Sequence, residues 1–319
     1  MTLLATIGAR RRGQPPSDPA IPYVMPTSAP WNAPTYATTP TPDGTGSVVH
    51  PSVVDMCSPW NGYRYWMAAT PYYQAVDAKE NPCILGSNDG FTWHVPAGLT
   101  NPLVGAPVGG YNSDTEIVWD PDNARMVCYW RSVVGSTEAV WAATSVTGSV
   151  WTAAVQQYQT TGGTANILSP SVVRLAADRW AMFYVVGQAG FCRITAPSAL
   201  GPWSSPTAVS YAPGVGWLWH LGVQNVGGVL YAILDERSEP WGYWPATSTD
   251  DGLTWAVGSQ FMSNTAGWDD RYLYRAQFQP HEDGTHIRVW YSSDSTAAHS
   301  WRVGYTQVPR SLWPDPPAI

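Results

Sequence analysis

The sequence predicts an all-β fold, a five-bladed β-propeller preceded by an extended N-terminal arm. A unit occurs five times, in which an apolar strand-like run is followed by a turn, an aromatic-rich strand, a second turn and a third strand. The units begin near residues 50, 114, 169, 220 and 274. This period of roughly 50–65 residues suits four-stranded blades. No helix-period segment of useful length interrupts it.

A tight turn gives the second observation. The stretch from Ser248 to Trp255 reads S-x-D-x-G-x-T-W. Gly252 can adopt the positive φ of a hairpin turn, and Asp250 can accept hydrogen bonds from the turn amides. We expect the Trp255 indole to pack beneath the turn. A copy one residue shorter runs from Ser87 to Trp93, which indicates a repeated unit. We expect this turn to define the fold and to perform no chemistry.

The length, composition and net charge favour a globular all-β protein and argue against nucleic-acid binding and membrane insertion. The chain has 319 residues, enough for one large all-β domain or two smaller ones. Its 19 tryptophans and 17 tyrosines could stack on sugars, although most should fill the spaces between sheets. The net charge of −7 argues against a nucleic-acid partner. No apolar stretch is long enough to insert into a membrane. The apolar run 3–7 precedes the basic run 10–12, which is the reverse of a signal peptide.

The first 45 residues differ from the rest. They are rich in Pro, Thr, Ser and Ala and lack strand periodicity. We therefore expect an arm over 1–45 and the propeller over 46–319. The arm is either a disordered tail or an anchor that docks into a larger assembly.

The cysteines and acidic residues suggest no cofactor and no metal site. Cys57, Cys83, Cys128 and Cys192 are widely spaced, so we expect buried free thiols. The triplet 281–283 should be a solvated turn. No Gly-rich phosphate loop or G-x-S-x-G motif is present. Asp114 and His220 could at most contribute to a cation in the channel.

Two family resemblances add to this interpretation. The segment from Pro197 to Trp203, S-x-x-G-P-W, resembles five-bladed glycoside hydrolases of families 43 and 32, as does the first inner strand from His50 to Val53. The S-x-D-x-G-x-T-W turn resembles the Asp box of sialidases. The hydrolase-like layout covers residues ~46–310, and it implies a propeller that binds or cuts glycans.

The segments 60–67, 80–84, 87–90 and 113–116 resemble minor tail proteins of tailed phages that infect actinobacteria. This resemblance implies a virion protein of the tail tip or baseplate, made in the host cytoplasm without a signal peptide. It implies a host envelope polysaccharide as ligand and other tail proteins as partners through the arm. Lys79 is the only lysine, and such an arginine bias fits a GC-rich genome.

Ligands of propellers bind at one mouth of the central channel, near the starts of the inner strands. The residues predicted there are His50, Glu80, Asp114, Glu116, Trp219, His220, Tyr274 and Arg275. We expect Asp114 and Glu116 to share one face of their strand. Arg275 could bind an anionic sugar or neutralise Asp114.

The hydrolase resemblance implies an Asp, an Asp and a Glu on the first three inner strands. Here these positions hold His50, Asp114 and Ser169, so two acids are missing. The prediction is therefore a tail protein that binds host envelope glycan, with a purely structural assembly protein as a further hypothesis. The alternative is an active glycoside hydrolase in which Asp114, Glu116 and His220 perform catalysis. Equally, these side chains could only form hydrogen bonds within the channel.

Overall fold

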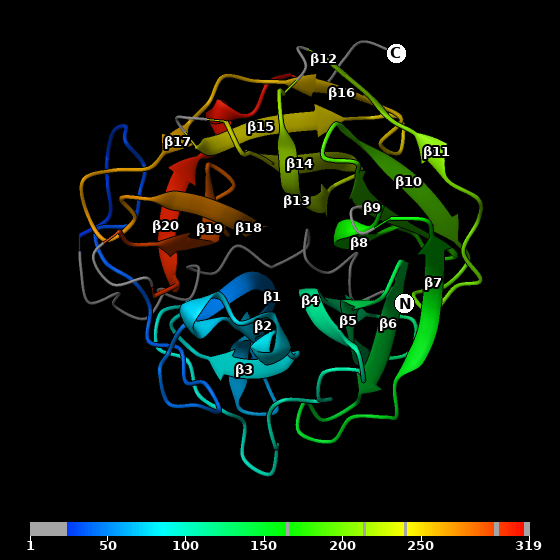
Figure 1. The fold of residues 1–319 in the computed structure, drawn as a ribbon. Helices are drawn as coiled ribbons and strands as arrows, with labels where there is room; N and C mark the ends of the chain where they lie inside the picture. The colour runs from blue at the N-terminus through cyan, green and yellow to red at the C-terminus, as the bar shows by residue number, and fades with distance from the viewer. Residues whose placement is uncertain (1–23, 164–165, 213–214, 239–240, 297–299, 316–319) are drawn as a thin grey trace.

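The computed structural model describes residues 24–163, 166–212, 215–238, 241–296 and 300–315. Five largely antiparallel sheets stand in a ring around a central axis (Figure 1). The innermost strand of each sheet contacts the innermost strands of both neighbouring sheets. The predicted five-bladed β-propeller is therefore confirmed. Among the described residues, no helix is long and apolar enough to cross a membrane.

The blades follow one another along the chain. Blade 1 holds β1 (Val48–Trp60), β2 (Tyr63–Pro71) and β3 (Cys83–Ser87). Blade 2 holds β4 (Gly110–Asp120), β5 (Arg125–Val134), β6 (Thr137–Ser145) and β7 (Val155–Thr161). Blade 3 holds β8 (Leu168–Ala176), β9 (Arg179–Val186), β10 (Gly190–Ala196) and β11 (Thr207–Ala208).

Blade 4 is the widest sheet, with β12 (Ser210–Ala212), β13 (Leu218–Val226), β14 (Val229–Glu236), β15 (Gly242–Ser248), β16 (Thr254–Val257) and β17 (Met262–Ser263). Blade 5 holds β18 (Tyr272–Pro280), β19 (His286–Asp294) and β20 (Arg302–Pro309). Three short 3-10 helices are η1 (Tyr73–Ala75), η2 (Asp77–Lys79) and η3 (Arg310–Leu312). The prediction of four strands per blade was wrong for blades 1 and 5, which have three strands, and for blade 4, which has six.

The core lies between neighbouring blades. On the middle strand β9, Phe183 packs into the apolar layer toward blade 4, while Met182 and Tyr184 pack into the layer toward blade 2. Successive side chains of a strand point to opposite faces. Because both faces of a middle strand are covered, its sequence is continuously apolar and not alternating.

The turn at 248–255 has the expected hydrogen bonds. Gly252 adopts a φ of 82°. One carboxylate oxygen of Asp250 accepts hydrogen bonds from the amides of Leu253 and Thr254, both at 3.0 Å. The Trp255 indole N–H donates to the Gly252 carbonyl at 3.0 Å. Partial burial acts to raise the pKa of Asp250, but the hydrogen bonds that its carboxylate accepts lower the pKa overall.

Equivalent turns in blades 1, 2 and 4 also pack against the blade that precedes each of them in the ring. A Cβ on Gly90, Gly148 or Gly252 would meet the rings of Trp290, Trp66 and Phe183, respectively, each on the middle strand of the preceding blade. Trp290 further donates its indole N–H to the Gly90 carbonyl at 2.7 Å. The sequence analysis missed the blade 2 turn, because Thr147 occupies the place of the aspartate.

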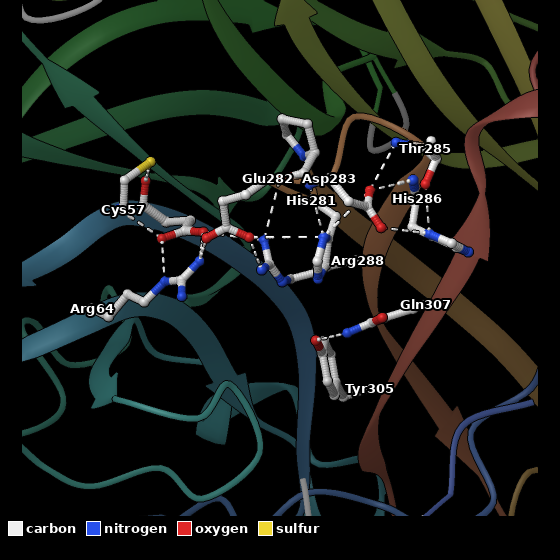
Figure 2. Close-up of polar contacts among 12 residues, drawn as sticks. Cys57, Arg64, His281, Glu282, Asp283, Thr285, His286, Arg288, Tyr305 and Gln307 are labelled. Atoms are coloured by element: carbon white, nitrogen blue, oxygen red, sulfur yellow. Dashed lines mark hydrogen bonds and ion pairs between the residues drawn. The ribbon is translucent and has the colours of Figure 1, made fainter. Parts of the chain in front are cut away.

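Blades 1 and 5 close the ring through a buried ion network (Figure 2). Arg64 donates two hydrogen bonds to Asp55, both at 2.9 Å, and the fully buried Arg288 reaches the same carboxylate at 3.3 Å. Glu282 accepts hydrogen bonds from both arginines. The triplet 281–283 is therefore only partly a solvated turn, because its central residue joins the two blades.

Residues 31–39, here named the strap, lie along the same junction. The Ala37 amide donates to the Val303 carbonyl of blade 5 at 2.7 Å. The Thr38 amide donates to the Phe91 carbonyl of blade 1 at 3.1 Å. Asn32 donates to the buried Asp269 carboxylate at 2.6 Å. The strap thus contacts the outer edges of the first and last blades. The role of the arm as an anchor to other proteins stays a prediction.

Candidate functional site

In three consecutive blades, a non-glycine residue near the start of the inner strand adopts the left-handed backbone conformation. His50, Asp114 and Ser169 have φ angles of 54°, 49° and 52°. Each lies where the register of the inner strand shifts against its neighbour. Positive φ is uncommon outside glycine, and β-bulges re-aim side chains next to active sites. The bulges therefore mark this end of the channel as the place to look for chemistry.

His50, Asp114 and His220 come together there, and we call them the channel cluster. One oxygen of Asp114 lies 3.5 Å from His50 Nε2 and 3.3 Å from His220 Nδ1. The three side chains are buried, with exposures of 2%, 2% and 1%. Each offers one ligand atom within 4.8 Å of the others. No metal site was expected from the sequence, but these three residues are placed where they could hold a metal ion.

Apart from their contacts with one another, the facing atoms of the channel cluster have no hydrogen-bond partner among the residues that the structure describes. This holds for His50 Nε2, Asp114 Oδ1 and both ring nitrogens of His220. Buried polar atoms are rarely left unpaired. Two ligands held about 2.1 Å from one ion lie roughly 3–3.5 Å apart, which fits the two separations measured here. The donor set of two imidazoles and one carboxylate therefore suits a divalent cation.

His50 is held in place from its other ring nitrogen. His50 Nδ1 lies 2.9 Å from Thr70 Oγ1 and accepts a hydrogen bond from the Asp114 amide at 3.2 Å. The Thr115 hydroxyl donates to the His50 carbonyl at 3.0 Å. These contacts orient the ring so that Nε2 faces Asp114. For Nε2 to bind a metal ion, the ring proton must lie on Nδ1 and be donated to Thr70 Oγ1, in place of the hydrogen bond from the Asp114 amide.

Electrostatics keep both histidines neutral and the aspartate charged. Burial lowers the pKa of His50 to about 3, and burial also lowers the pKa of His220. Burial alone would raise the pKa of Asp114, but a hydrogen bond from His220 and the charge of Arg131 act in the opposite direction and favour the ionised carboxylate. Neutral imidazole and ionised carboxylate are the forms that bind metal ions.

Glu80, Tyr274 and Trp219 surround the channel cluster, as the sequence analysis predicted for the mouth. Glu80 Oε2 lies 3.6 Å from His50 Nδ1 and has no hydrogen-bond partner. Burial and the nearby Asp114 raise the pKa of Glu80 well above its usual range. The ring of Tyr274 lies 4.2 Å from that of His220, and Trp219 meets His220 edge-to-face. Tyr274 and Trp219 are partly exposed, whereas the three residues of the channel cluster are buried.

Glu116 and Arg275 pair with each other and not with the channel cluster. Arg275 donates to a Glu116 carboxylate oxygen at 2.7 Å and to the Thr115 and Pro170 carbonyls. Both side chains are fully buried. Arg275 thus neutralises Glu116, not Asp114, and does not reach the surface where a sugar would bind. Asp114 and Glu116 contact different residues because the strand register shifts between Ser113 and Glu116.

Arg131 is a site residue that the sequence analysis missed. It lies 3.7 Å from Asp114 and donates to Glu138 at 2.8 Å. Arg131 belongs to β5, the middle strand of blade 2, so no position near an inner-strand start could reveal it. Two open surface grooves, one lined by Arg193 and Trp203 and the other by Arg310 and Trp313, include no residue of the channel cluster.

The comparisons with known proteins concern this same propeller. No family model matches the chain. It is 29% identical over 308 residues to the A type blood N-acetyl-α-D-galactosamine deacetylase of Flavonifractor plautii. The match covers 77% of this chain and 40% of that enzyme, so the chain spans less than half the length of the relative.

Solved structures agree on the fold. An N-acetylgalactosamine deacetylase from F. plautii, in complex with blood group B trisaccharide, superposes with a TM-score of 0.76 at 23% identity, over 88% of this chain and 97% of that one. The family 43 endo-arabinanase of Bacillus licheniformis gives a TM-score of 0.59 at 13% identity, over 88% and 99%. The family 62 α-L-arabinofuranosidase of Coprinopsis cinerea gives 0.62 at 12%, over 90% and 99%. The resemblance to propellers of glycoside hydrolases is therefore shown for the fold.

Proposed function

We propose that this chain is a carbohydrate deacetylase that hydrolyses the acetamido group of an N-acetylated sugar with the help of a divalent cation. The unpartnered, mutually facing atoms of the channel cluster carry this proposal. The 29% identity to a deacetylase acting on N-acetylgalactosamine supports it. That relative is more than twice as long as the matched part, so its substrate is only a guide.

His50, Asp114 and His220 would hold the cation, which supplies Lewis-acid polarisation of a carbonyl oxygen. The other residues bind and orient the substrate. Tyr274 and Trp219 offer aromatic surfaces at the exposed side of His220. Glu80 has an unpaired carboxyl oxygen beside His50 Nδ1, the ring nitrogen that faces away from the proposed cation position, and we assign it to orienting the His50 ring.

The reaction is amide hydrolysis. Water supplies the hydroxyl that bonds to the acetyl carbon, and the bond from that carbon to nitrogen breaks. The leaving nitrogen takes up a proton, and the products are acetate and a free amino sugar. Arg131 and the buried Glu116–Arg275 pair do not touch the reacting groups, and we assign them to positioning Asp114 and the strand β4.

Glycoside hydrolysis is the alternative. It requires two carboxyl groups facing each other across the scissile bond, about 5–9.5 Å apart. Glu116 is engaged by Arg275 and Gln277, so Asp114 and Glu80 are the acids left for this role. The bulged arrangement that directs Asp114 toward two histidines favours the deacetylase.

A place in a phage tail remains a separate proposal about location and partners. It rests on the resemblance of the segments 60–67, 80–84, 87–90 and 113–116 to minor tail proteins. In that setting a host envelope polysaccharide would be the ligand, and tail proteins would bind the arm. Mass spectrometry of purified virions from a phage encoding this chain would detect the protein among tail components, and its absence there would refute the proposal.

The deacetylase is tested by following two products at once. Full-length protein is incubated with N-acetylhexosamine oligosaccharides, and both acetate and new reducing ends are measured. We expect acetate release that stops on chelation and returns when a divalent cation is added. Asp114→Asn should reduce the rate by about 100-fold or more, since it removes a direct ligand. Asp122→Asn, at an exposed carboxylate bound to Arg174, should leave the rate unchanged.

Reducing ends in place of acetate would establish the glycosidase alternative. Retention of the polysaccharide without either product would favour a glycan-binding tail protein. Acetate release that is insensitive to chelation would contradict the role assigned to the channel cluster.

A further inference from the structure

Arg237 lies among three tryptophans beside the channel cluster. It follows β14, whose Asp235 pairs with His220 on β13, so Arg237 is at the same end of the blade as the cluster. Its guanidinium carbon lies 4.1 Å from the ring centroid of Trp219, 5.3 Å from that of Trp217 and 5.6 Å from that of Trp241. The Arg237 amide donates to the Trp217 carbonyl at 2.8 Å, which fixes the loop.

The guanidinium of Arg237 makes no hydrogen bond or ion pair with any residue that the structure describes. Every other arginine in the described ranges pairs with a carboxylate or donates to a protein oxygen. The tryptophan faces attract the positive charge, but they leave the N–H donors of the fork unused. Arg237 is half-buried, so these donors are partly shielded from water.

The two acids that precede Arg237 in the chain, both within the described residues, do not neutralise it by contact. Glu236 instead accepts a hydrogen bond from the Gly216 amide at 3.1 Å. Asp235 is buried, and neither of its oxygens has a partner. Glu236 is near enough that it weakens the positive field of Arg237, so any anion bound here must make direct contact with the guanidinium.

One indole separates Arg237 from the channel cluster. The ring centroid of Trp219 is 5.9 Å from that of His220, and His220 faces Asp114 at 3.3 Å. A sugar next to the one that reacts would therefore lie over this part of the surface. Trp217 is 45% exposed, and its indole N–H donates to Gln188 at 2.7 Å, so its ring is held in a fixed orientation.

We propose that Arg237 binds the carboxylate of an acidic sugar adjacent to the N-acetylated unit, so that the site prefers glycans containing a hexuronic acid. The planar fork of the guanidinium matches a carboxylate through two parallel hydrogen bonds. This inference rests on the proposed function for the identity of the reacting sugar, but the binding preference can be measured independently of catalysis.

The experiment is calorimetric titration of the full chain with two matched ligands. One is a disaccharide of a hexuronic acid and an N-acetylhexosamine, and the other is the same disaccharide with its carboxyl reduced to the alcohol. We expect the acidic ligand to bind about tenfold more tightly, since hydrogen bonds to charged groups are worth roughly 1.5–3 kcal/mol. Arg237→Met should remove this preference and leave the neutral ligand's affinity unchanged.

Two further variants separate recognition from structure. Arg237→Lys keeps the charge but lacks the fork, so it should retain only part of the preference. Arg310→Met is the matched control, because Arg310 also lies over an aromatic ring, that of Tyr231. It should keep the full preference.

Equal binding of both ligands by the natural chain, or undetectable binding of both, would overturn the inference. Equal weakening of both ligands by Arg237→Met would also overturn it and would indicate that Arg237 only supports the tryptophans. A preference for the acidic ligand without acetate release would leave this inference standing and refute the deacetylase. Acetate release without any preference for the acidic ligand would support the deacetylase and refute this inference about Arg237.

Discussion

Asp235 is a buried acid whose cost to stability can be measured. It is 1% exposed, both of its oxygens are unpaired, and burial raises its pKa well above the usual range. The unfolded chain releases this proton near pH 3.9, whereas the native chain retains it to a higher pH. Stability is therefore lost as the pH rises from the unfolded pKa toward the folded one.

Asp235→Asn should remove that loss. We expect it to stabilise the chain at pH 7 by about 1 kcal/mol, or roughly 2 °C in Tm. Below pH 4 the two proteins should have similar stability. Urea unfolding at several pH values between 4 and 8 measures the difference, with Asp122→Asn as a control at an exposed acid. Parallel pH profiles for Asp235→Asn and the natural chain would contradict the assignment.

At the residue scale, the sequence predicted which residues lie near the channel cluster but not how they contact one another. His50, Asp114 and His220 could be predicted because propeller ligands gather near the starts of inner strands. Their mutual approach could not, since it depends on bulges at non-glycine residues with φ near 50°. Arg237 was missed because its surroundings come from Trp217, Trp219 and Trp241, which meet it only through the fold.

At the scale of elements, the hairpin turns fix the spacing between blades. The internal hydrogen bonds of the turn at 248–255 could be predicted from residue types. Gly252 can adopt the positive φ of the turn, and Asp250 can accept hydrogen bonds from its amides. Its packing on the preceding blade did not, since Phe183 is remote in sequence. A Cβ at position 252 would overlap the Phe183 ring, and Gly252 also has a φ of 82°.

Gly252→Ala should therefore destabilise the chain through both effects, by roughly 2–4 kcal/mol. Gly44→Ala is the matched control. Gly44 has a φ of 72°, but nothing lies within 4 Å of the added carbon, so only the backbone strain of about 1 kcal/mol applies. Thermal unfolding of both variants compares them. Equal losses would show that packing of the turn on blade 3 contributes little.

At the scale of the whole molecule, a propeller must join its first and last blades. Within the described part of the chain, blades 1 and 5 share no strand, because each forms its own three-stranded sheet. The junction depends instead on the apolar layer that holds Tyr65 and Trp290, on the ion network of Asp55, Arg64, Glu282 and Arg288, and on the strap. The composition of residues 1–45 gave no sign of the strap, because its contacts are mainly backbone hydrogen bonds, which any residue except proline can donate.

Deletion of residues 1–39 should open this junction and lower the free energy of unfolding by several kcal/mol. The deletion removes the Asn32 donor from the buried Asp269, the Ala33 carbonyl from Trp268, and the backbone bonds to Val303 and Phe91. Asn32→Ala alone should cost about 1–3 kcal/mol, since it leaves a buried carboxylate with fewer donors. Val108→Ala, at a position that is 98% exposed and outside the strap, is the control.

The channel cluster gives this deletion a second readout. His50 lies on β1, and Asp114 and His220 lie on blades 2 and 4, so the cluster keeps its geometry only while the ring stays closed. We therefore expect the deletion to weaken cation binding, measured by calorimetry, together with stability. If stability falls while cation affinity is unchanged, the strap serves only the outer edges of blades 1 and 5. If neither changes, the ring is closed by the apolar layer and the ion network between blades 1 and 5 without the strap.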